Sequence, residues 1–283
     1  MRIVMDDAGD VPADVAEKYN IIIVPINIMF GTEQFLSGIS MDHDAFYEKV
    51  KTVGAHNFPK TSQPTPYQFA EIYKSILAEG ESEVLTITVS EKLSGTYASA
   101  VAAGRELVGQ GTFHLYDSQA GSAGQGLMAI EAARMAADGH DYAAIKARLD
   151  EMLQSQSIYF LIDSLEYAVK GGRVSSMRST MATLLNIKPI MTLKDGIITE
   201  AGKVRTYNKA LAYMIDAVKA DVGDKPVKLA VMHGGAEQAG RSLLEMARSS
   251  FNITEEYLVN MAISVAINLG PGALGLVAIP EVA

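Results

Sequence analysis

Length, composition and charge exclude several classes of protein. The chain has 283 residues, which is long for a single core and sufficient for two domains. Hydrophobic residues make up 48% of the sequence and charged residues 20%, as in globular proteins, so a disordered chain is excluded. A net charge of −9 without a basic stripe argues against a nucleic-acid partner. The sequence contains no cysteine, which excludes disulfides and thiolate metal ligands.

The first part of the chain, residues 1–160, predicts an α/β domain. Apolar runs rich in Ile, Val and aromatic residues alternate with segments of helical spacing, a pattern typical of a mainly parallel sheet with flanking helices. The first run is short and leads into acidic residues, unlike the apolar region of a signal peptide, so we expect a cytoplasmic protein. The expected strands are 2–5, 21–30, 84–89 and 112–116, and the expected helices are 12–19, 42–51, 66–79, 98–108 and 123–137.

One of these helices has a clear start signal. Thr65 is a suitable N-cap, Pro66 fits the first helical position, and Gln68 completes a capping box. Thr61 and Ser62 are then expected on the loop that enters this helix.

Ser94 and Gly95 have a comparable setting, between the expected strand 84–89 and the helix 98–108. Loops at the carboxyl ends of parallel strands are where ligands collect. Hydroxyls and glycines in such loops offer hydrogen bonds and accessible backbone N–H groups, which can hold an anionic head group. The alternative is that these serines and threonines cap helices for purely local reasons.

The second part, residues 161–283, predicts an α+β domain. Short strands lie close together around Asp195-Gly196, a dipeptide typical of a hairpin turn. The expected strands are 188–193, 196–200, 203–206 and 228–233, and the expected helices are 209–220 and 236–249.

An uncharged stretch from 257 to 280 has the length of a membrane span. Asn260, Ser264 and Asn268 interrupt it, however, and Gly270-Pro271-Gly272 would break a helix within the bilayer. We therefore expect two buried strands joined by a tight turn.

The glycines of this turn spell Gly270-x-Gly272-x-x-Gly275, the spacing of a dinucleotide-binding loop. Such a loop needs a complete βαβ unit after its first strand, and too little chain follows Gly275. The sequence also lacks a P-loop and a Gly-x-Ser-x-Gly nucleophile elbow. We therefore predict no catalytic residue, no metal and no cofactor.

A second glycine-containing segment, Lys170-Gly171-Gly172-Arg173, predicts a flexible turn with a cation on each side. It is either a solvated surface turn or part of a basic patch. Arg178 and Arg205 are the residues that could complete such a patch, which would bind phosphate or an acidic partner.

Taken together, these segments resemble the DegV family of bacterial fatty-acid-binding proteins. They occur in the family's order and span nearly the whole chain. The resemblance implies a two-domain protein with a long-chain acyl ligand buried between its domains. The matching segments are Thr61-Ser62-Gln63-Pro64, Leu93-Ser94-Gly95-Thr96-Tyr97, Lys170-Gly171-Gly172-Arg173-Val174, Lys188-Pro189-Ile190 and Gly270-Pro271-Gly272-Ala273-Leu274-Gly275.

The resemblance also implies roles for individual residues. Thr61 and Ser94 match hydroxyls expected to bind the carboxylate, and Arg173 matches an arginine implicated in work with a partner kinase. At Asn268 family members usually carry a histidine, and asparagine can donate a hydrogen bond but carries no positive charge. The expected head-group residues are Thr61, Ser62, Ser94, Gly95, Asn268 and Gly270, and the expected partner or phosphate patch is Lys170, Arg173 and Arg205.

The implied role is that of a carrier rather than an enzyme. The protein would present a bound fatty acid to a separate ATP-dependent kinase, in phospholipid metabolism, with at most transient contact with a membrane surface. One alternative is a stand-alone phosphotransferase that uses Asp6 and Asp7 with a divalent metal, although these acids and Asp10 are more typical of a surface turn. Another is a binding protein for a small anionic or phosphorylated metabolite.

Overall fold

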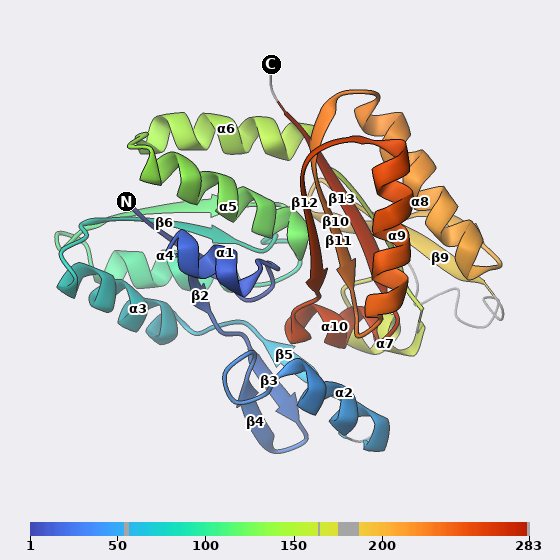
Figure 1. Cartoon of the computed structure of the whole chain (residues 1–283). Coiled ribbons are helices and arrows are strands. Elements are labelled where there is room, and N and C mark those ends of the chain that lie inside the picture. Colours follow the sequence, from blue (N-terminus) through green and yellow to red (C-terminus); the bar gives the residue numbers. More distant parts are fainter. Residues whose placement is uncertain (54–56, 164, 175–186, 282–283) are drawn as a thin grey trace. The chain divides into compact units, whose positions relative to one another are not determined.

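The computed structural model describes residues 1–53, 57–163, 165–174 and 187–281 (Figure 1). The chain divides into two compact units. Unit 1 consists of Met1–Leu153 together with Ala262–Ser264, and unit 2 consists of Gln154–Met261 together with Val265–Ala283.

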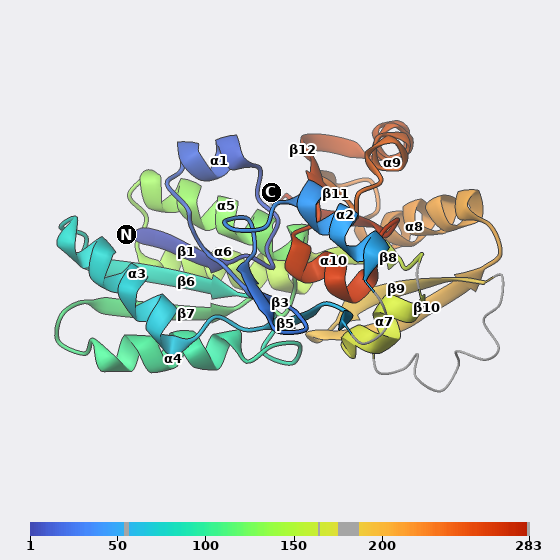
Figure 2. The same cartoon turned by 90° about the horizontal axis from the view of Figure 1, so that it is seen from below.

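Unit 1 is built on a four-stranded parallel sheet of order β2-β1-β6-β7, as the sequence predicts. The two central strands are almost wholly buried, which explains their near-continuous apolar sequences. Helices α5 and α6 lie on one side of the sheet and α3 and α4 on the other (Figures 1 and 2). The elements are β1 (Arg2–Asp6), α1 (Ala13–Lys18), β2 (Ile22–Val24), α3 (Pro66–Ala78), β6 (Glu83–Thr88), α4 (Thr96–Glu106), β7 (Thr112–Asp117), α5 (Ala123–Ala137) and α6 (Tyr142–Ser155).

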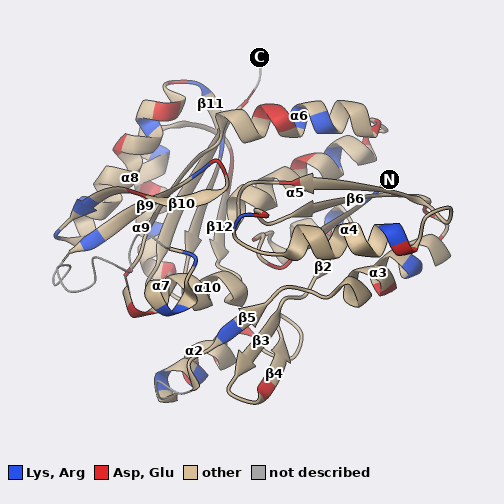
Figure 3. Cartoon of the chain, turned by 180° about the vertical axis from the view of Figure 1, so that it is seen from behind, with Lys and Arg blue, Asp and Glu red and all other residues tan. Residues whose placement is uncertain are grey.

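The surfaces of these helices carry mixed charge. Basic and acidic residues lie next to one another on α6 (Figure 3). Lys146 and Asp150 form an ion pair of 2.6 Å one helical turn apart. Within the described residues, no helix is long and apolar enough to cross a membrane.

A second, antiparallel sheet of order β4-β3-β5 belongs to the same unit and was not predicted. The expected strand 21–30 is wrong as a single strand, because the chain leaves the parallel sheet at Pro25, which has no N–H for continued pairing. Thr61 and Ser62, which were expected on a loop, lie in strand β5, where they pair with Ile28 and Asn27 of strand β3. The elements are β3 (Asn27–Phe30), β4 (Glu33–Leu36), α2 (His43–Thr52) and β5 (Lys60–Ser62).

Unit 2 contains a mixed six-stranded sheet of order β10-β9-β8-β13-β11-β12, which confirms the predicted α+β character. Asp195 and Gly196 both have positive φ, 50° and 73°, as the predicted hairpin turn requires. The strand that follows is continuous, with a shift of register between Glu200 and Gly202, and is not two separate strands. The strands are β8 (Ser157–Leu161), β9 (Lys188–Lys194), β10 (Ile197–Val204), β11 (Pro226–His233), β12 (Asn252–Asn260) and β13 (Leu274–Pro280).

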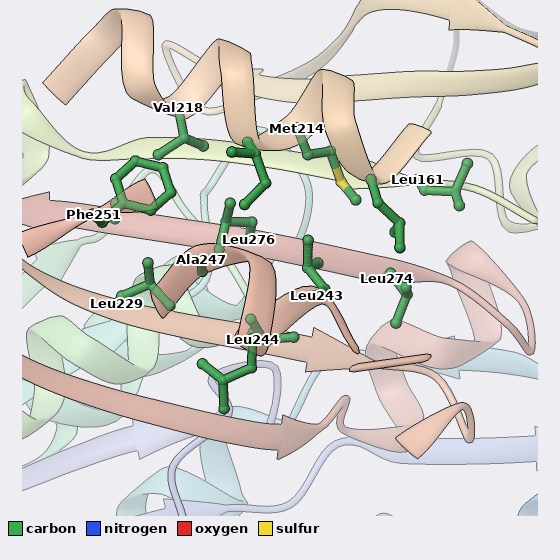
Figure 4. Close-up of a cluster of buried hydrophobic side chains, with 14 of the residues drawn as sticks. Leu161, Met214, Val218, Leu229, Leu243, Leu244, Ala247, Phe251, Leu274 and Leu276 are labelled. Atoms are coloured by element: carbon green, nitrogen blue, oxygen red, sulfur yellow. The ribbon is translucent and has the colours of Figure 1, made fainter. Parts of the chain in front are cut away.

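The core of unit 2 forms between this sheet and two long helices. Met214 and Val218 of α8 and Leu243 of α9 pack with Leu274 and Leu276 of β13 (Figure 4). All five side chains are fully buried. The helices of the unit are α7 (Leu165–Gly171), α8 (Tyr207–Val222) and α9 (Glu237–Ser250), together with most of α10 (Ile263–Leu269), which begins in the unit 1 segment Ala262–Ser264.

The last of these helices corrects the prediction of two strands joined by a tight turn. The chain between β12 and β13 forms α10 before it reaches the glycine turn. Ile263, Ala266 and Ile267 are buried at i, i+3 and i+4, the spacing of one helix face. The sequence does not reveal this helical spacing, because apolar residues also occur at alternate positions of the same segment. A short apolar run of this kind fits a strand as well as a helix.

Candidate functional site

In unit 1, two of the predicted polar loops lie against each other. Gln63 follows β5, and a methyl group in place of a hydrogen on Gly95 would lie 2.7 Å from the Nε2 atom of Gln63. The side-chain amide of Asn27 donates to the carbonyl of Gln63 at 3.1 Å, which fixes the chain after β5. The structure therefore brings the segment of Thr61 and Ser62 to the loop of Ser94 and Gly95.

The loop of Ser94 leads directly into α4. The hydroxyls of Ser94 and Thr96 share a hydrogen bond of 2.8 Å, and the backbone N–H of Ser94 donates to the carbonyl of Ser90 at 3.1 Å. Gly95 occupies the N-cap of α4 without a side-chain cap. The first N–H groups of a helix lack intrahelical acceptors, so this end of α4 offers hydrogen-bond donors to an anion.

The acidic residues at the end of β1 and just after it do not form a surface turn, so that prediction is wrong. Asp6 is fully buried and Asp10 is 7% exposed. The carboxylate of Asp6 accepts hydrogen bonds from the backbone N–H groups of Ala8 (3.0 Å) and Val89 (2.8 Å). Burial raises the pKa of Asp6 to about 6. These bonds tie the end of β1 to the end of β6.

Asp10 holds together two segments that are distant in sequence. Its carboxylate accepts hydrogen bonds from the Ser122 hydroxyl and, at 2.7 Å, from the backbone N–H of Ala262. Ser122 has φ 52°, a conformation that non-glycine residues adopt infrequently. Burial raises the pKa of Asp10 to about 7. The hydrogen bond from Ala262 holds the segment Ala262–Ser264 to the rest of unit 1.

In unit 2, strand register gathers the predicted residues at one edge of the sheet. Leu161 of β8 lies opposite Leu274 of β13, and Val204 of β10 lies opposite Lys188 of β9. The chain after β8, the glycine turn before β13 and the exposed Arg205 after β10 therefore share this edge.

The segment of Lys170 is not the flexible turn that the sequence predicts. Lys170 and Gly171 form the last turn of α7, and Gly172 follows with φ 75°. Lys170 pairs with Glu166 one turn earlier at 2.6 Å. The exposed guanidinium of Arg173 donates from Nη1 to the carbonyl of Gly171 at 2.8 Å. Arg178, the other predicted member of the patch, lies outside the described residues.

Asn268 lies directly beside the end of α7. A methyl group on Gly171 would lie 2.6 Å from the Oδ1 atom of Asn268 and 2.9 Å from its Cα. Only glycine at this position allows so close an approach. The structure thus brings together Asn268 and the glycine pair that precedes Arg173.

The glycine turn joins α10 to β13. Gly270 and Gly272 have φ of 87° and 83°, and Gly270 closes the end of α10 by donating to the carbonyl of Ala266 at 2.8 Å. The turn leads into a strand, whereas a dinucleotide-binding loop opens a helix. This geometry agrees with the rejection of a dinucleotide site.

Sequence reasoning missed one charged pair at the same edge of the sheet. Asp163 and Lys188 form an ion pair, and a methyl group on Gly272 would lie 2.9 Å from the Oδ2 atom of Asp163. Lys188 begins the segment Lys188-Pro189-Ile190, but nothing local to Lys188 or Asp163 in the sequence indicates that the two side chains meet.

Unit 1 presents hydroxyls and a glycine at the start of α4, and unit 2 presents an amide, a glycine turn and a few cations, each on its own sheet. This defines a class of two-unit α/β proteins, one unit with a parallel sheet and one with a mixed sheet. The chain belongs to the DegV family: the family model described as an uncharacterised protein of the DegV family matches residues 1–281.

Relatives of known sequence cover nearly the whole chain. A DegV domain-containing protein of Listeria innocua is 32% identical over 277 residues, which cover 98% of this chain and 97% of the relative. The protein DegV of Bacillus subtilis is 30% identical over 279 residues and covers 98% of both chains.

Solved structures of the family have the same fold. A DegV family protein from Thermus thermophilus, described as binding fatty acid, has a TM-score of 0.91 and 31% identity, covering 99% of this chain and 100% of its own. DegV of Bacillus subtilis, described as a fatty acid binding protein, has a TM-score of 0.86, 28% identity and 99% coverage of both chains. A stearic acid-binding protein from Eubacterium ventriosum has a TM-score of 0.89 and 26% identity, covering 99% of this chain and 98% of its own.

Proposed function

We propose that this protein binds a long-chain fatty acid and presents its carboxylate to a separate ATP-dependent fatty-acid kinase. The observation that carries the proposal is the fold shared over nearly the whole chain with DegV proteins described as fatty acid binding. The location of the acyl chain between two domains, the cytoplasmic setting, the place in phospholipid metabolism and the transient membrane contact are parts of the same proposal and rest on the family resemblance.

The polar residues are chemically suited to a carboxylate. A carboxylate removed from water must receive hydrogen bonds or it takes up a proton. We assign this role to Thr61, Ser62, Ser94 and Gly95 in unit 1 and to Asn268 and Gly270 in unit 2. The adjacency of Gln63 and Gly95, at 2.7 Å, supports the grouping in unit 1. The acyl chain would supply most of the affinity, at roughly 0.8 kcal/mol for each buried methylene.

The cationic residues are assigned a different task. Lys170, Arg173 and Arg205 are exposed in unit 2, where they can meet an acidic partner or a phosphate. In this scheme the kinase performs the phosphoryl transfer, and this chain supplies the bound acyl group. The alternative of a phosphotransferase centred on Asp6 and Asp7 receives no support from the hydrogen bonds of Asp6, which tie two strands together.

The division between binding and partner residues can be tested with two variants. Ser94→Ala removes a hydroxyl from the head-group loop and is expected to weaken fatty-acid binding about tenfold, since hydrogen bonds to charged groups contribute roughly 1.5–3 kcal/mol. Arg173→Ala is expected to retain binding and to impair phosphorylation by the kinase with ATP. Calorimetric titration with oleate and a coupled phosphorylation assay measure the two effects.

Ser75→Ala is the matched control, because Ser75 is exposed on α3 away from both polar loops. This control is expected to bind like the wild type. Equal loss of fatty-acid binding in Ser94→Ala and Arg173→Ala would contradict the division of roles.

A further inference from the structure

The antiparallel pairing of β3 with β5 ends at a position that the sequence explains. The last paired residues at this end of the ladder are Asn27 and Ser62. Two residues further along, the same register would place Pro25 opposite Pro64, and proline has no backbone N–H with which to continue the ladder. The chain that follows β5 therefore needs other hydrogen bonds to hold it in place.

Amide side chains provide these hydrogen bonds. The Nδ2 atom of Asn27 carries two hydrogens, and it donates to the carbonyl of Gln63 at 3.1 Å and to Oε1 of Gln68 at 3.3 Å. Gln68 lies in the first turn of α3, where its Oε1 also accepts from the backbone N–H of Thr65 at 2.9 Å. Its Nε2 donates to the carbonyl of Pro25 at 3.4 Å. Asn27 thus ties the residue after β5 both to β3 and to the start of α3.

Gln63, the residue held in this way, lies against the loop that begins α4. A methyl group on Gly95 would lie 2.7 Å from Nε2 and 3.1 Å from Cδ of Gln63, so the side-chain amide rests against Gly95. Both residues are exposed, so a ligand can reach them. Ser94 precedes Gly95 directly, and its hydroxyl is one of the groups that we assign to the carboxylate. The position of Gln63 therefore limits where that hydroxyl can lie.

We propose that Asn27 is a positioning residue of the head-group loop, where it acts through Gln63 to hold the hydroxyl of Ser94 in place for a carboxylate. This inference rests on the proposed function and names a residue that the same site needs without contact with the ligand. A hydrogen bond weakens steeply when its angle or distance changes, so a loop held in advance binds a carboxylate more tightly than one that must be ordered. Asn27 carries no charge, so its effect is one of position only.

The experiment compares two lipids of equal chain length, palmitate and hexadecanol, which differ only in the head group. Their binding is measured by displacement of a fluorescent fatty acid whose affinity is first determined for each variant. Asn27→Leu keeps the branched shape of the side chain and removes both donors. It is expected to weaken palmitate binding about tenfold and hexadecanol binding far less, as for the loss of one charge-assisted hydrogen bond. Asn252→Leu is the matched control, because Asn252 is the exposed first residue of β12, as Asn27 is the first residue of β3.

A second measurement follows the head group itself. Palmitate with an isotopic label at its carboxyl carbon reports, by NMR at a series of pH values, the pKa of the bound carboxyl group. Hydrogen bonds to the charged form lower that pKa. Asn27→Leu is therefore expected to raise the pKa of bound palmitate relative to the wild type, whereas a general loss of protein stability would leave it unchanged.

The outcomes separate this inference from the proposed function. Equal weakening of both lipids in Asn27→Leu, or no change in either, overturns the positioning role and leaves fatty-acid binding intact. A wild type that does not bind palmitate overturns the proposed function and this inference together. If Asn27→Leu does not fold, Gln63→Ala removes the exposed amide that rests against Gly95 and is expected to show the same selective loss of palmitate. Unchanged palmitate binding in Gln63→Ala would then overturn the inference.

Discussion

Burial controls the pKa values of the carboxyl groups at the end of β1 and in the turn that follows it. The pKa is raised to about 6 in Asp6 and to about 7 in Asp7 and Asp10, and desolvation is the main cause in all three. The charges of Asp6 and Asp10 raise the pKa of Asp7 further, while hydrogen bonds from Ser37 and Ser264 oppose the shift. Within the described residues, the buried Oδ2 of Asp7 has no hydrogen-bond partner.

These shifts predict how stability depends on pH. A folded-state pKa above the unfolded value of 3.8 means that the folded protein holds its protons to higher pH. The stability that these groups contribute is fully present below the unfolded pKa of 3.8. It is lost as the pH rises through the folded pKa values of about 6 to about 7. We therefore expect a higher urea midpoint at pH 5.5 than at pH 8, and a smaller difference in Asp10→Asn. An unchanged difference in that variant would show that Asp10 is not one of the responsible groups.

The start of α3 is the element that the sequence predicts most completely. Thr65 accepts a hydrogen bond from the N–H of Gln68 at 3.2 Å, and Gln68 accepts one from the N–H of Thr65 at 2.9 Å. Thr65→Ala is expected to lower the free energy of unfolding by about 1 kcal/mol, because the backbone N–H of Gln68 loses the hydroxyl that accepts its hydrogen bond. Thr65→Ser keeps the hydroxyl and serves as the control. Urea denaturation measures both, and equal destabilisation by the two variants would contradict the capping role.

Local signals explain which elements could be predicted. The cap at Thr65, the hairpin at Asp195-Gly196 and the helical spacing of 123–137 are all contained in short stretches of sequence, and all are confirmed. α10 could not be separated from a strand, because its short apolar run fits both periods. The same limit applies to the chain around Pro25, where one apolar run supplies strands to two different sheets.

The candidate site was predictable only in its local parts. Thr61, Ser94 and the glycine turn could be selected because hydroxyls and glycines after strands are visible in the sequence. The contacts of Asp10 with Ser122 and Ala262, and of Asp163 with Lys188, depend on segments that meet only after folding. No periodicity or spacing identifies such pairs.

At the scale of the whole molecule, the chain returns to unit 1 after completing most of unit 2. Ala262–Ser264 belongs to unit 1 although the chain on both sides belongs to unit 2. The domain boundary that the sequence places between residues 160 and 161 stays a prediction. Family membership over residues 1–281 means that the complete two-unit fold, not one domain of it, is what this protein shares with fatty-acid-binding relatives.

The most direct test of this account is denaturing mass spectrometry of an organic extract from the gently purified protein. The account predicts a long-chain fatty acid in near-stoichiometric amount, since each buried methylene adds roughly 0.8 kcal/mol to retention. Protein stripped of lipid is then expected to take up added palmitate. A protein that is purified empty and also rejects added fatty acids would contradict the account and favour a small anionic ligand.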